Sequence, residues 1–202
     1  SDSTNVLALE CALRRRTQRR EATHAQDVVR LCASHRFVRA QRYTAPNLRA
    51  HFRVFTLCTG GRGVGAGRFE VAALTEQLDF YLRFLGSLER YGCQVADVRA
   101  TFTPLAGDRE RGYLQEQVMS PLAGQFPTAR LEFDPNPTTI PGYYGWVRFQ
   151  IYASTPDGVE HMIGDGGFNN WTQKLLSDRR ERLLTSGIAT ERIATLFRQN
   201  ES

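Results

Sequence analysis

Lysine is almost absent from this sequence: Lys174 is the only one, so arginine supplies 25 of the 26 basic residues. No apolar run approaches the roughly 18 residues that a membrane-spanning helix needs, and no charged-then-apolar secretion signal opens the chain. The four cysteines are widely spaced, without the CxxC or His/Cys clusters typical of zinc sites and disulfide frameworks. We therefore expect no membrane contact, no structural metal, and an intracellular reducing compartment, either cytoplasm or an organelle matrix.

The composition fits one folded domain. The 202 residues are 41% hydrophobic and 10% aromatic, which is enough for a core. The net charge of +5 comes almost entirely from arginine, whose planar fork binds phosphates and carboxylates. This excess permits nucleotide or RNA binding, but GC-rich coding DNA, which favours arginine codons, is the preferred explanation.

The local patterns predict an α+β fold with a mostly antiparallel sheet. Residues 1–19 form a basic N-terminal segment, expected to be a solvated face or tail, and residues 20–199 form the domain. We expect helices over residues 22–34, 74–91, 112–122, 171–177 and 189–199. We expect strands over residues 51–58, 94–102, 129–133, 144–153, 158–163 and 183–188. Three further segments are predicted as a flexible glycine-rich loop or hairpin tip (60–67), a tight turn or a close backbone approach to a ligand (164–167), and a basic exposed stretch (178–182).

No Walker loop, GxSxG or HExxH motif is present, but four segments occur in an informative order. They are Arg20–Thr23 followed by Val28–Arg30; Phe52-Arg53 followed by a Gly/Arg loop and Gly67–Phe69; Tyr143–Gln150; and Asp165–Gly167 followed by Ser186–Arg192. Together they resemble the "RPEGT…VVR" segment, motif 2, the "YYTGTVFE" strand and the "GGRYD…GFAIGIER" segment of histidyl-tRNA synthetases. The chain is thus similar to the catalytic domain of class II aminoacyl-tRNA synthetases, and the resemblance implies their antiparallel sheet flanked by helices.

The resemblance implies a site for ATP with Mg²⁺, where a carboxylate attacks the α-phosphate to give an acyl adenylate. Arg53 matches the motif 2 arginine that holds the α-phosphate, and Arg192 matches the motif 3 arginine that lies against the nucleotide. Arg62 and Arg68 are further candidates for contact with ATP, because they lie in or beside the glycine-rich segment.

The same resemblance gives substrate-binding candidates. Glu21 and Thr23 match the pair that receives a substrate amino group, and Tyr143 and Tyr144 match residues that line the amino-acid pocket. The remaining candidates are Gln150, Gly166 and Gly167. All of these residues have structural readings too: cross-strand or helix ion pairs for the arginines, core aromatics for the tyrosines and turn formation for the glycines.

Several family positions carry different residues here. The motif 2 glutamate is replaced by Phe55, the catalytic-loop arginine and aspartate by Thr139 and Gly142, and two other carboxylates by Gln150 and Asn170. Motif 1, which builds the family's dimer interface, has no match, and no anticodon-binding domain follows Arg192 in this sequence. We expect that histidine is not the substrate and that the chain is a fragment or a shortened relative.

Two functions follow. In the favoured hypothesis, the chain is a synthetase-like pseudoenzyme that acts as a regulatory, structural or RNA-binding subunit. The reason is that other residues cannot easily replace the catalytic groups lost at five positions of one site. The alternative is a respecialised ATP-dependent ligase that adenylates an amino or carboxylic acid and transfers it to a carrier, amine or RNA. The partner is accordingly RNA or a larger protein assembly, and the family also implies a homodimer.

Overall fold

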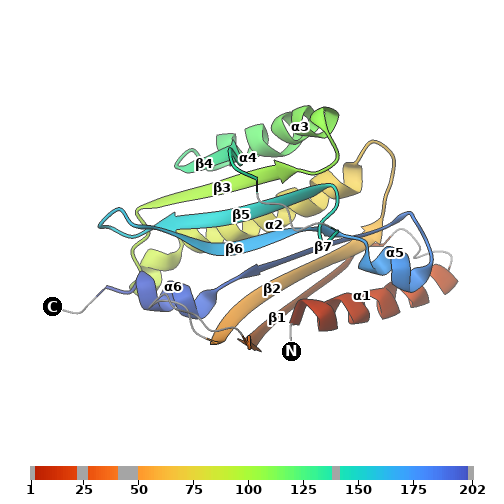
Figure 1. Ribbon diagram of the computed structural model, residues 1–202, viewed down its shortest axis with the longest axis horizontal. Helices are drawn as coiled ribbons and strands as arrows, with labels where there is room; N and C mark the ends of the chain where they lie inside the picture. The colour runs from red at the N-terminus through yellow and green to blue at the C-terminus, as the bar shows by residue number, and fades with distance from the viewer. Residues whose placement is uncertain (1–2, 22–26, 41–49, 138–141, 200–202) are drawn as a thin grey trace.

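A single mixed sheet organises the chain. The computed structural model describes residues 3–21, 27–40, 50–137 and 142–199, and within them seven strands form one sheet (Figure 1). In spatial order these are β1 (Val29–Val38), β2 (His51–Arg62), β7 (Glu181–Ile188), β6 (Glu160–Asn169), β5 (Val147–Ser154), β3 (Asp97–Pro104) and β4 (Ala129–Phe133). Only β3 and β4 are parallel neighbours, so the expected mostly antiparallel α+β fold is confirmed.

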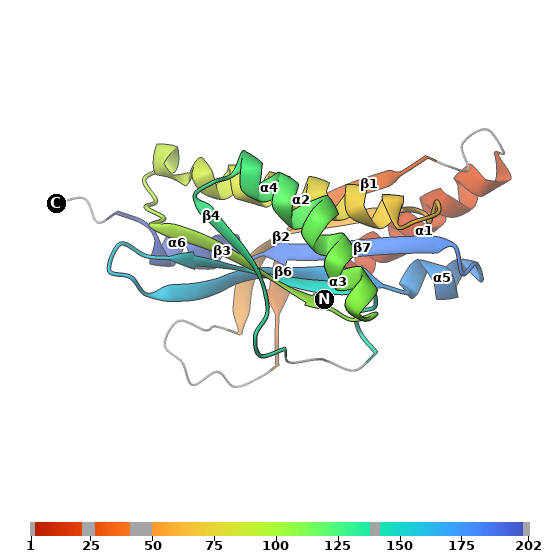
Figure 2. The same ribbon diagram turned by 90° about the horizontal axis from the view of Figure 1, so that it is seen from above.

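The helices lie against this sheet. They are α1 (Ser3–Arg20), α2 (Arg68–Gly86), the 3₁₀ turn η2 (Leu88–Tyr91), α3 (Asp108–Leu114), the π-helical η3 (Gln115–Met119), α4 (Ser120–Gln125), α5 (Trp171–Leu176) and α6 (Thr190–Leu196). Figure 1 shows α2 running behind the strands, and Figure 2 shows α2 and α4 on the same side of the sheet. None of the described helices is long and apolar enough to cross a membrane.

Consecutive residues of β7 separate the two cores, because neighbouring side chains of a strand point to opposite faces. Leu184 belongs to the larger core that α2 covers, which also contains Leu78 and Phe149. Leu183 belongs to a smaller core that α1 covers, together with Leu7 and Cys58. Helices α1 and α2 therefore pack on opposite faces of the central strands.

The basic N-terminal segment is a packed helix rather than a tail. Cys11 of α1 is fully buried, and a Cβ atom built on Gly60 of β2 would lie 2.1 Å from its Sγ atom. A glycine is required there because α1 crosses the strand too closely for any side chain. The prediction of a flexible glycine-rich loop is thus wrong for Gly60 and Gly61, which lie within β2 and pair with β7.

The helix predicted over residues 22–34 is wrong where the structure describes it. Residues 29–38 form β1, which pairs with β2 over its whole length, from Val29 opposite Gly60 to Val38 opposite His51. Burial along its first residues alternates, with Val29 and Leu31 more buried than Arg30 and Cys32. This is the period of a strand with one covered face, and the short apolar cluster was compatible with either period.

Two further predictions need correction: the turn over residues 164–167, and the end of the exposed stretch 178–182, of which Arg179 and Arg180 are exposed as expected. Residues 164–167 form the second half of β6 and not a turn, since they pair with β5 on one side and β7 on the other. The stretch 178–182 contains Glu181, which is fully buried as the first residue of β7. The strands predicted over residues 51–58, 129–133 and 183–188 are confirmed, as are the helices over 171–177 and 189–199 apart from their ends.

Candidate functional site

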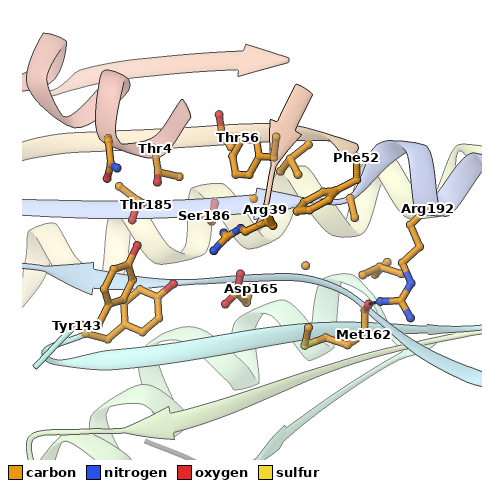
Figure 3. Close-up of a pocket in the computed structure, with 18 residues that line it drawn as sticks. Thr4, Arg39, Phe52, Thr56, Tyr143, Met162, Asp165, Thr185, Ser186 and Arg192 are labelled. Carbon is orange, nitrogen blue, oxygen red and sulfur yellow. Dashed lines mark hydrogen bonds between the residues drawn. The ribbon is translucent and has the colours of Figure 1, made fainter. Parts of the chain in front are cut away.

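A cavity of about 560 Å³ lies over the middle strands, on the face opposite α2. Its floor includes Val54 and Thr56 of β2, Asp165 of β6, and Thr185 and Gly187 of β7. The first turn of α1 closes one side through Thr4 and Asn5. In Figure 3, Tyr143 lies at one end of the cavity and Arg192 at the other, with Arg39 and Asp165 in the middle.

Two arginines bring positive charge into the cavity. Arg39 follows β1, and its backbone N–H donates to the carbonyl of Ala50 at 2.8 Å, which continues the β1–β2 ladder and fixes where the side chain starts. Arg192 of α6 donates from Nη1 to the carbonyl of Met162 at 2.8 Å. Its Nε is buried without a hydrogen-bond partner among the described residues, and burial lowers the pKa of Arg192. A desolvated cation with an unused donor favours an anionic ligand.

One carboxylate and two tyrosines complete the polar walls. Asp165 is the only acidic residue among those that line the cavity in the described part of the chain. Tyr143 and Tyr144 pack edge to face with their ring centroids 4.6 Å apart, and Tyr143 also packs against Trp171 at 5.7 Å. A Cβ atom on Gly167 would lie 2.5 Å from Cδ1 of Tyr144 and 2.7 Å from the carbonyl of Val147, so this glycine lets the tyrosine lie against the strand.

A buried hydrogen-bond network supports the floor from the α2 side. The Ser186 hydroxyl donates to Oε1 of Gln77 at 2.6 Å, and Nε2 of Gln77 donates to the hydroxyl of Thr59 at 2.9 Å. The hydroxyl of Tyr81 lies 2.8 Å from that of Ser186, and burial raises the pKa of Tyr81 well above its ordinary value. These contacts tie α2 to β7 and β2, so the strands under the cavity are held in a fixed register.

The comparisons with known proteins place the fold. No protein-family model matches the chain, and neither does any curated protein sequence. Solved structures do match. Histidyl-tRNA synthetase from S. aureus superposes with a TM-score of 0.60 at 18% identity, covering 89% of this chain and 47% of that one. The fold is that of the class II aminoacyl-tRNA synthetases.

Two other solved structures share this fold. The RNA binding domain of threonyl-tRNA synthetase from Cryptosporidium parvum Iowa II gives a TM-score of 0.58 at 15% identity, with 85% of this chain and 44% of that chain covered. An ATP phosphoribosyltransferase regulatory subunit/histidyl-tRNA synthetase from Bacillus halodurans C gives a TM-score of 0.58 at 14% identity, and the match covers 99% of this chain and 64% of that chain. The chain thus spans about half to two thirds of the length of these synthetase-fold proteins.

Of the four arginines that the sequence indicated, one lines this cavity. Arg192 lines the cavity. Arg53 is an exposed residue of β2 that alternates with the cavity-lining Phe52 and Val54, and it does not line the cavity. Its backbone N–H donates to Oε2 of Glu191 at 3.0 Å. Arg62 and Arg68 lie outside it too: Arg62 is 3.6 Å from the Asp178 carboxylate, and Arg68 is the exposed first residue of α2.

The substrate-binding candidates divide in the same way. Tyr143 and Tyr144 line the cavity, whereas Glu21 is exposed just after α1 and Thr23 lies outside the described residues. Gln150 is buried in β5 and donates to Sδ of Met162 at 3.0 Å. Gly166 and Gly167 are interior residues of β6, next to the lining residue Asp165.

Sequence reasoning missed the arginine that enters the middle of the cavity. Arg39 directly follows Phe37 and Val38, the last residues of β1. Because residues 22–34 were predicted to be a helix, this strand was not expected. The alternation of Phe52, Val54 and Thr56 was the available signal for the floor, because a period of two places these three side chains on one face.

The cavity fits an anion better than a protein-bound Mg²⁺ ion. The described residues contain no group of three or more His, Cys, Asp or Glu side chains that could hold a metal. Magnesium is bound through carboxylates and phosphates, and the one lining carboxylate, Asp165, shares the walls with two guanidinium groups.

His161 of β6 gives the fold a predicted pH dependence. Burial and the nearby charge of Arg192 lower the pKa of His161 below 6.5, against a smaller opposing effect of Asp157. As the pH falls below 6.5, the unfolded chain takes up this proton before the folded chain does, so the free energy of unfolding falls. His161→Gln is expected to reduce this pH-dependent decrease in the free energy of unfolding, as measured by urea denaturation at a series of pH values from 6.5 downwards. An unchanged slope would contradict the assignment to His161.

Proposed function

We propose that this chain is a synthetase-like regulatory subunit that binds an anionic ligand in its cavity and does not catalyse adenylation. The observation that carries the proposal is the charge of the cavity: among the described residues that line it, Arg39 and Arg192 face one carboxylate, that of Asp165. Such an arrangement attracts a phosphate or carboxylate group. The described residues of the cavity do not include the several acidic groups that would position Mg²⁺ and a substrate amine in an aminoacylating site.

Positions that differ from the family motifs support a non-catalytic role. Gln150 is buried in β5, and its side-chain amide donates a hydrogen bond to Sδ of Met162, so its side chain is part of the packed interior. Asn170 is exposed before α5 and does not line this cavity, and Phe55 stacks on Phe80 with ring centroids 5.5 Å apart. Thr139 lies outside the described residues. Gly142 is described as well: it is exposed, has a left-handed backbone with φ 78°, and does not line this cavity. Packing, solvent exposure or backbone conformation therefore accounts for each of the four described residues, and none of them lines this cavity.

The respecialised ligase remains the second candidate because of the same two arginines. Cations fixed at a developing phosphate charge are worth about 3–4 kcal/mol each in transition-state stabilisation. Arg39 and Arg192 would supply them if ATP binds with its α-phosphate between them. The ligase needs ATP with Mg²⁺ as its cofactor, whereas the regulatory subunit needs only a ligand that the cavity recognises.

The proposed partner is a catalytic protein chain. The Bacillus halodurans protein of the same fold is described as a regulatory subunit of ATP phosphoribosyltransferase, and the Cryptosporidium parvum domain as RNA binding. We favour the first kind of partner because the cavity and its arginines suit a small anion. All four cysteines are free thiols, three of them buried. An intracellular reducing compartment remains a proposal drawn from the cysteine spacing in the sequence.

Mixing the chain with the catalytic ATP phosphoribosyltransferase subunit of its own organism tests this role. We expect the two to elute together in size-exclusion chromatography and the rate of the catalytic subunit to change. Separate elution with an unchanged rate would contradict the proposed partner. Salt-sensitive binding of tRNA by the chain alone would instead favour an RNA-binding subunit.

A further inference from the structure

Helix α1 leaves a stripe of apolar side chains exposed along the face that points away from the sheet. Val6, Leu9 and Leu13 are 59%, 55% and 56% exposed, whereas Leu7 and Cys11 of the same helix are buried in the smaller core. Four of the ten large hydrophobic side chains that are exposed in the described residues lie on α1 and on α5, which packs against it (Figure 1). Single exposed hydrophobic residues are ordinary, but a contiguous stripe of them marks an interaction surface.

The spacing of the stripe is that of a seam between two paired helices. Val6, Leu9 and Leu13 are three and then four residues apart, and Arg16 and Arg20 continue the same alternation to the end of α1. Such positions lie one above the other on a helix and interlock with those of a second helix beside it. These five residues, called the α1 seam, therefore present an apolar half followed by a cationic half.

The surface around the cationic half of the seam is strongly basic. Apart from the buried ion pair that joins α1 to β7, residues 3–21 and 171–180 contain seven basic and three acidic side chains. Two of the acidic side chains already have partners within the chain: Glu10 pairs with an arginine one turn further along α1, and Asp178 lies 3.5 Å from Arg19. Positive charge therefore remains in excess around the seam.

Arg16 and Arg20 carry the charge of the seam itself. Both are exposed, and neither forms an ion pair within the described part of the chain. Their guanidinium groups are therefore available to carboxylates of a partner, which the planar fork of arginine binds well. Charges along the seam of a helix pair select both the partner and its orientation.

A second copy of the chain does not supply the missing negative charge. Parallel pairing of two α1 helices would set Arg16 against Arg16 and Arg20 against Arg20, and these like charges repel. Antiparallel pairing would place the same arginines beside the first turn of the other α1, which has no acidic residue. The charge of the seam thus favours a different chain that carries carboxylates.

The seam is narrow, which favours a helix over a lipid surface as its partner. Asn5, Glu10 and Thr17 are exposed or half-buried polar residues on either side of it. A helix that lies in a membrane interface presents a broad apolar face. A single row with polar flanks suits one partner helix instead.

We propose that the α1 seam docks an amphipathic, acidic helix of another protein, antiparallel to α1. Apolar residues of that helix pack on Val6, Leu9 and Leu13, and acidic residues in its first turns pair with Arg16 and Arg20. Acidic residues also stabilise the N-terminal turn of the helix that carries them, so the antiparallel orientation satisfies both requirements. This inference goes beyond the proposed function, because it concerns the outer face of α1 and not the cavity.

A synthetic peptide of about three heptads tests the chemistry of the seam. It carries glutamate at its first two seam positions, leucine at the next three, and alanine, glutamine and serine elsewhere, with a fluorescein label. A second peptide has lysine in place of the two glutamates. Fluorescence anisotropy with the full chain is expected to show saturable binding of the glutamate peptide at micromolar concentration and about tenfold weaker binding of the lysine peptide.

Substitutions on the exposed seam separate its two halves without touching the core. Leu9→Ser with Leu13→Ser, and separately Arg16→Glu with Arg20→Glu, should each weaken binding of the glutamate peptide about tenfold. The charge-reversed chain should in turn bind the lysine peptide more tightly than the glutamate peptide. Tyr91→Ser is the matched control, because Tyr91 is 76% exposed but lies in η2, and it should leave binding unchanged.

Four results would overturn the proposal. The first is equal binding of the two peptides by the unmodified chain, which needs no variant to fold. The second is unchanged binding after the two leucine substitutions. The third is a homodimer that the same substitutions dissociate in analytical ultracentrifugation, which would assign the seam to a second copy. The fourth is binding to phosphatidylglycerol vesicles that the same substitutions abolish, which would assign it to a lipid surface.

Discussion

Replacing Arg15 with alanine is expected to lower the free energy of unfolding by about 3–5 kcal/mol, because it leaves a buried carboxylate without its partner. Arg15 of α1 is fully buried. Its Nε and Nη2 donate to the two carboxylate oxygens of Glu181 at 2.9 and 3.0 Å, and its Nη1 donates to Gln18 and to the carbonyl of Asp27. The pair joins α1 to β7 across 166 residues of sequence. Urea denaturation at neutral pH measures the loss.

Arg14→Ala is the control for this prediction. Arg14 pairs with Glu10 on the exposed side of the same helix, so its loss should cost less than about 1 kcal/mol. Removing both buried charges with Arg15→Met and Glu181→Leu should cost less than Arg15→Ala, since no unpaired ion is left behind. A loss below 1 kcal/mol for Arg15→Ala would mean that α1 does not pack on the sheet as described.

ATP binding is expected to depend on Arg39 and Arg192 but not on Arg53. Loss of a hydrogen bond from a charged donor should weaken binding about ten- to a hundredfold for Arg39→Ala and for Arg192→Ala. Arg53 alternates with Phe52 and Val54 and lies outside the cavity, so Arg53→Ala should bind ATP within about twofold of the parent chain. Calorimetry in the presence of EDTA compares the three variants without Mg²⁺.

This comparison also decides which of two arginines contacts the phosphates of ATP. The sequence resemblance points to Arg53, whereas the geometry points to Arg39, ten residues after the start of β1. If Arg53→Ala abolishes ATP binding and Arg39→Ala does not, the cavity described here is not the nucleotide site. Loss of binding in all three variants with a lowered melting temperature would instead indicate general damage to the fold.

The sheet could largely be predicted because its inner strands carry strong local patterns. Residues 51–58 and 183–188 are rich in β-branched, aromatic and other apolar residues, without the breakers that would end a strand. Strand β1 could not be predicted with the same ease, because Val28, Val29, Leu31 and Cys32 suit a helix as well as a strand. Only its pairing with β2 shows that this segment is a strand and not a helix.

The candidate site could be predicted less well, because its residues meet through the sheet rather than through local sequence. Tyr143, Tyr144 and Arg192 were indicated by the resemblance and line the cavity. Arg39 was missed because the first part of β1, the strand that precedes it, was predicted as a helix over residues 22–34. Gly166 and Gly167 resembled a turn because their sequence alone does not reveal the rings that pack on them: a Cβ atom on Gly166 would lie 2.6 Å from the Phe149 ring.

The absence of adenylation is the central claim, and pyrophosphate exchange tests it most directly. The chain would be incubated with ATP, Mg²⁺, labelled pyrophosphate and each standard amino acid in turn, beside an active histidyl-tRNA synthetase as a positive control. We predict no incorporation of label into ATP above the background without protein, because the described lining of the cavity has one carboxylate beside two arginines. Exchange with any amino acid that is lost in Arg192→Ala would contradict the regulatory role and establish the ligase.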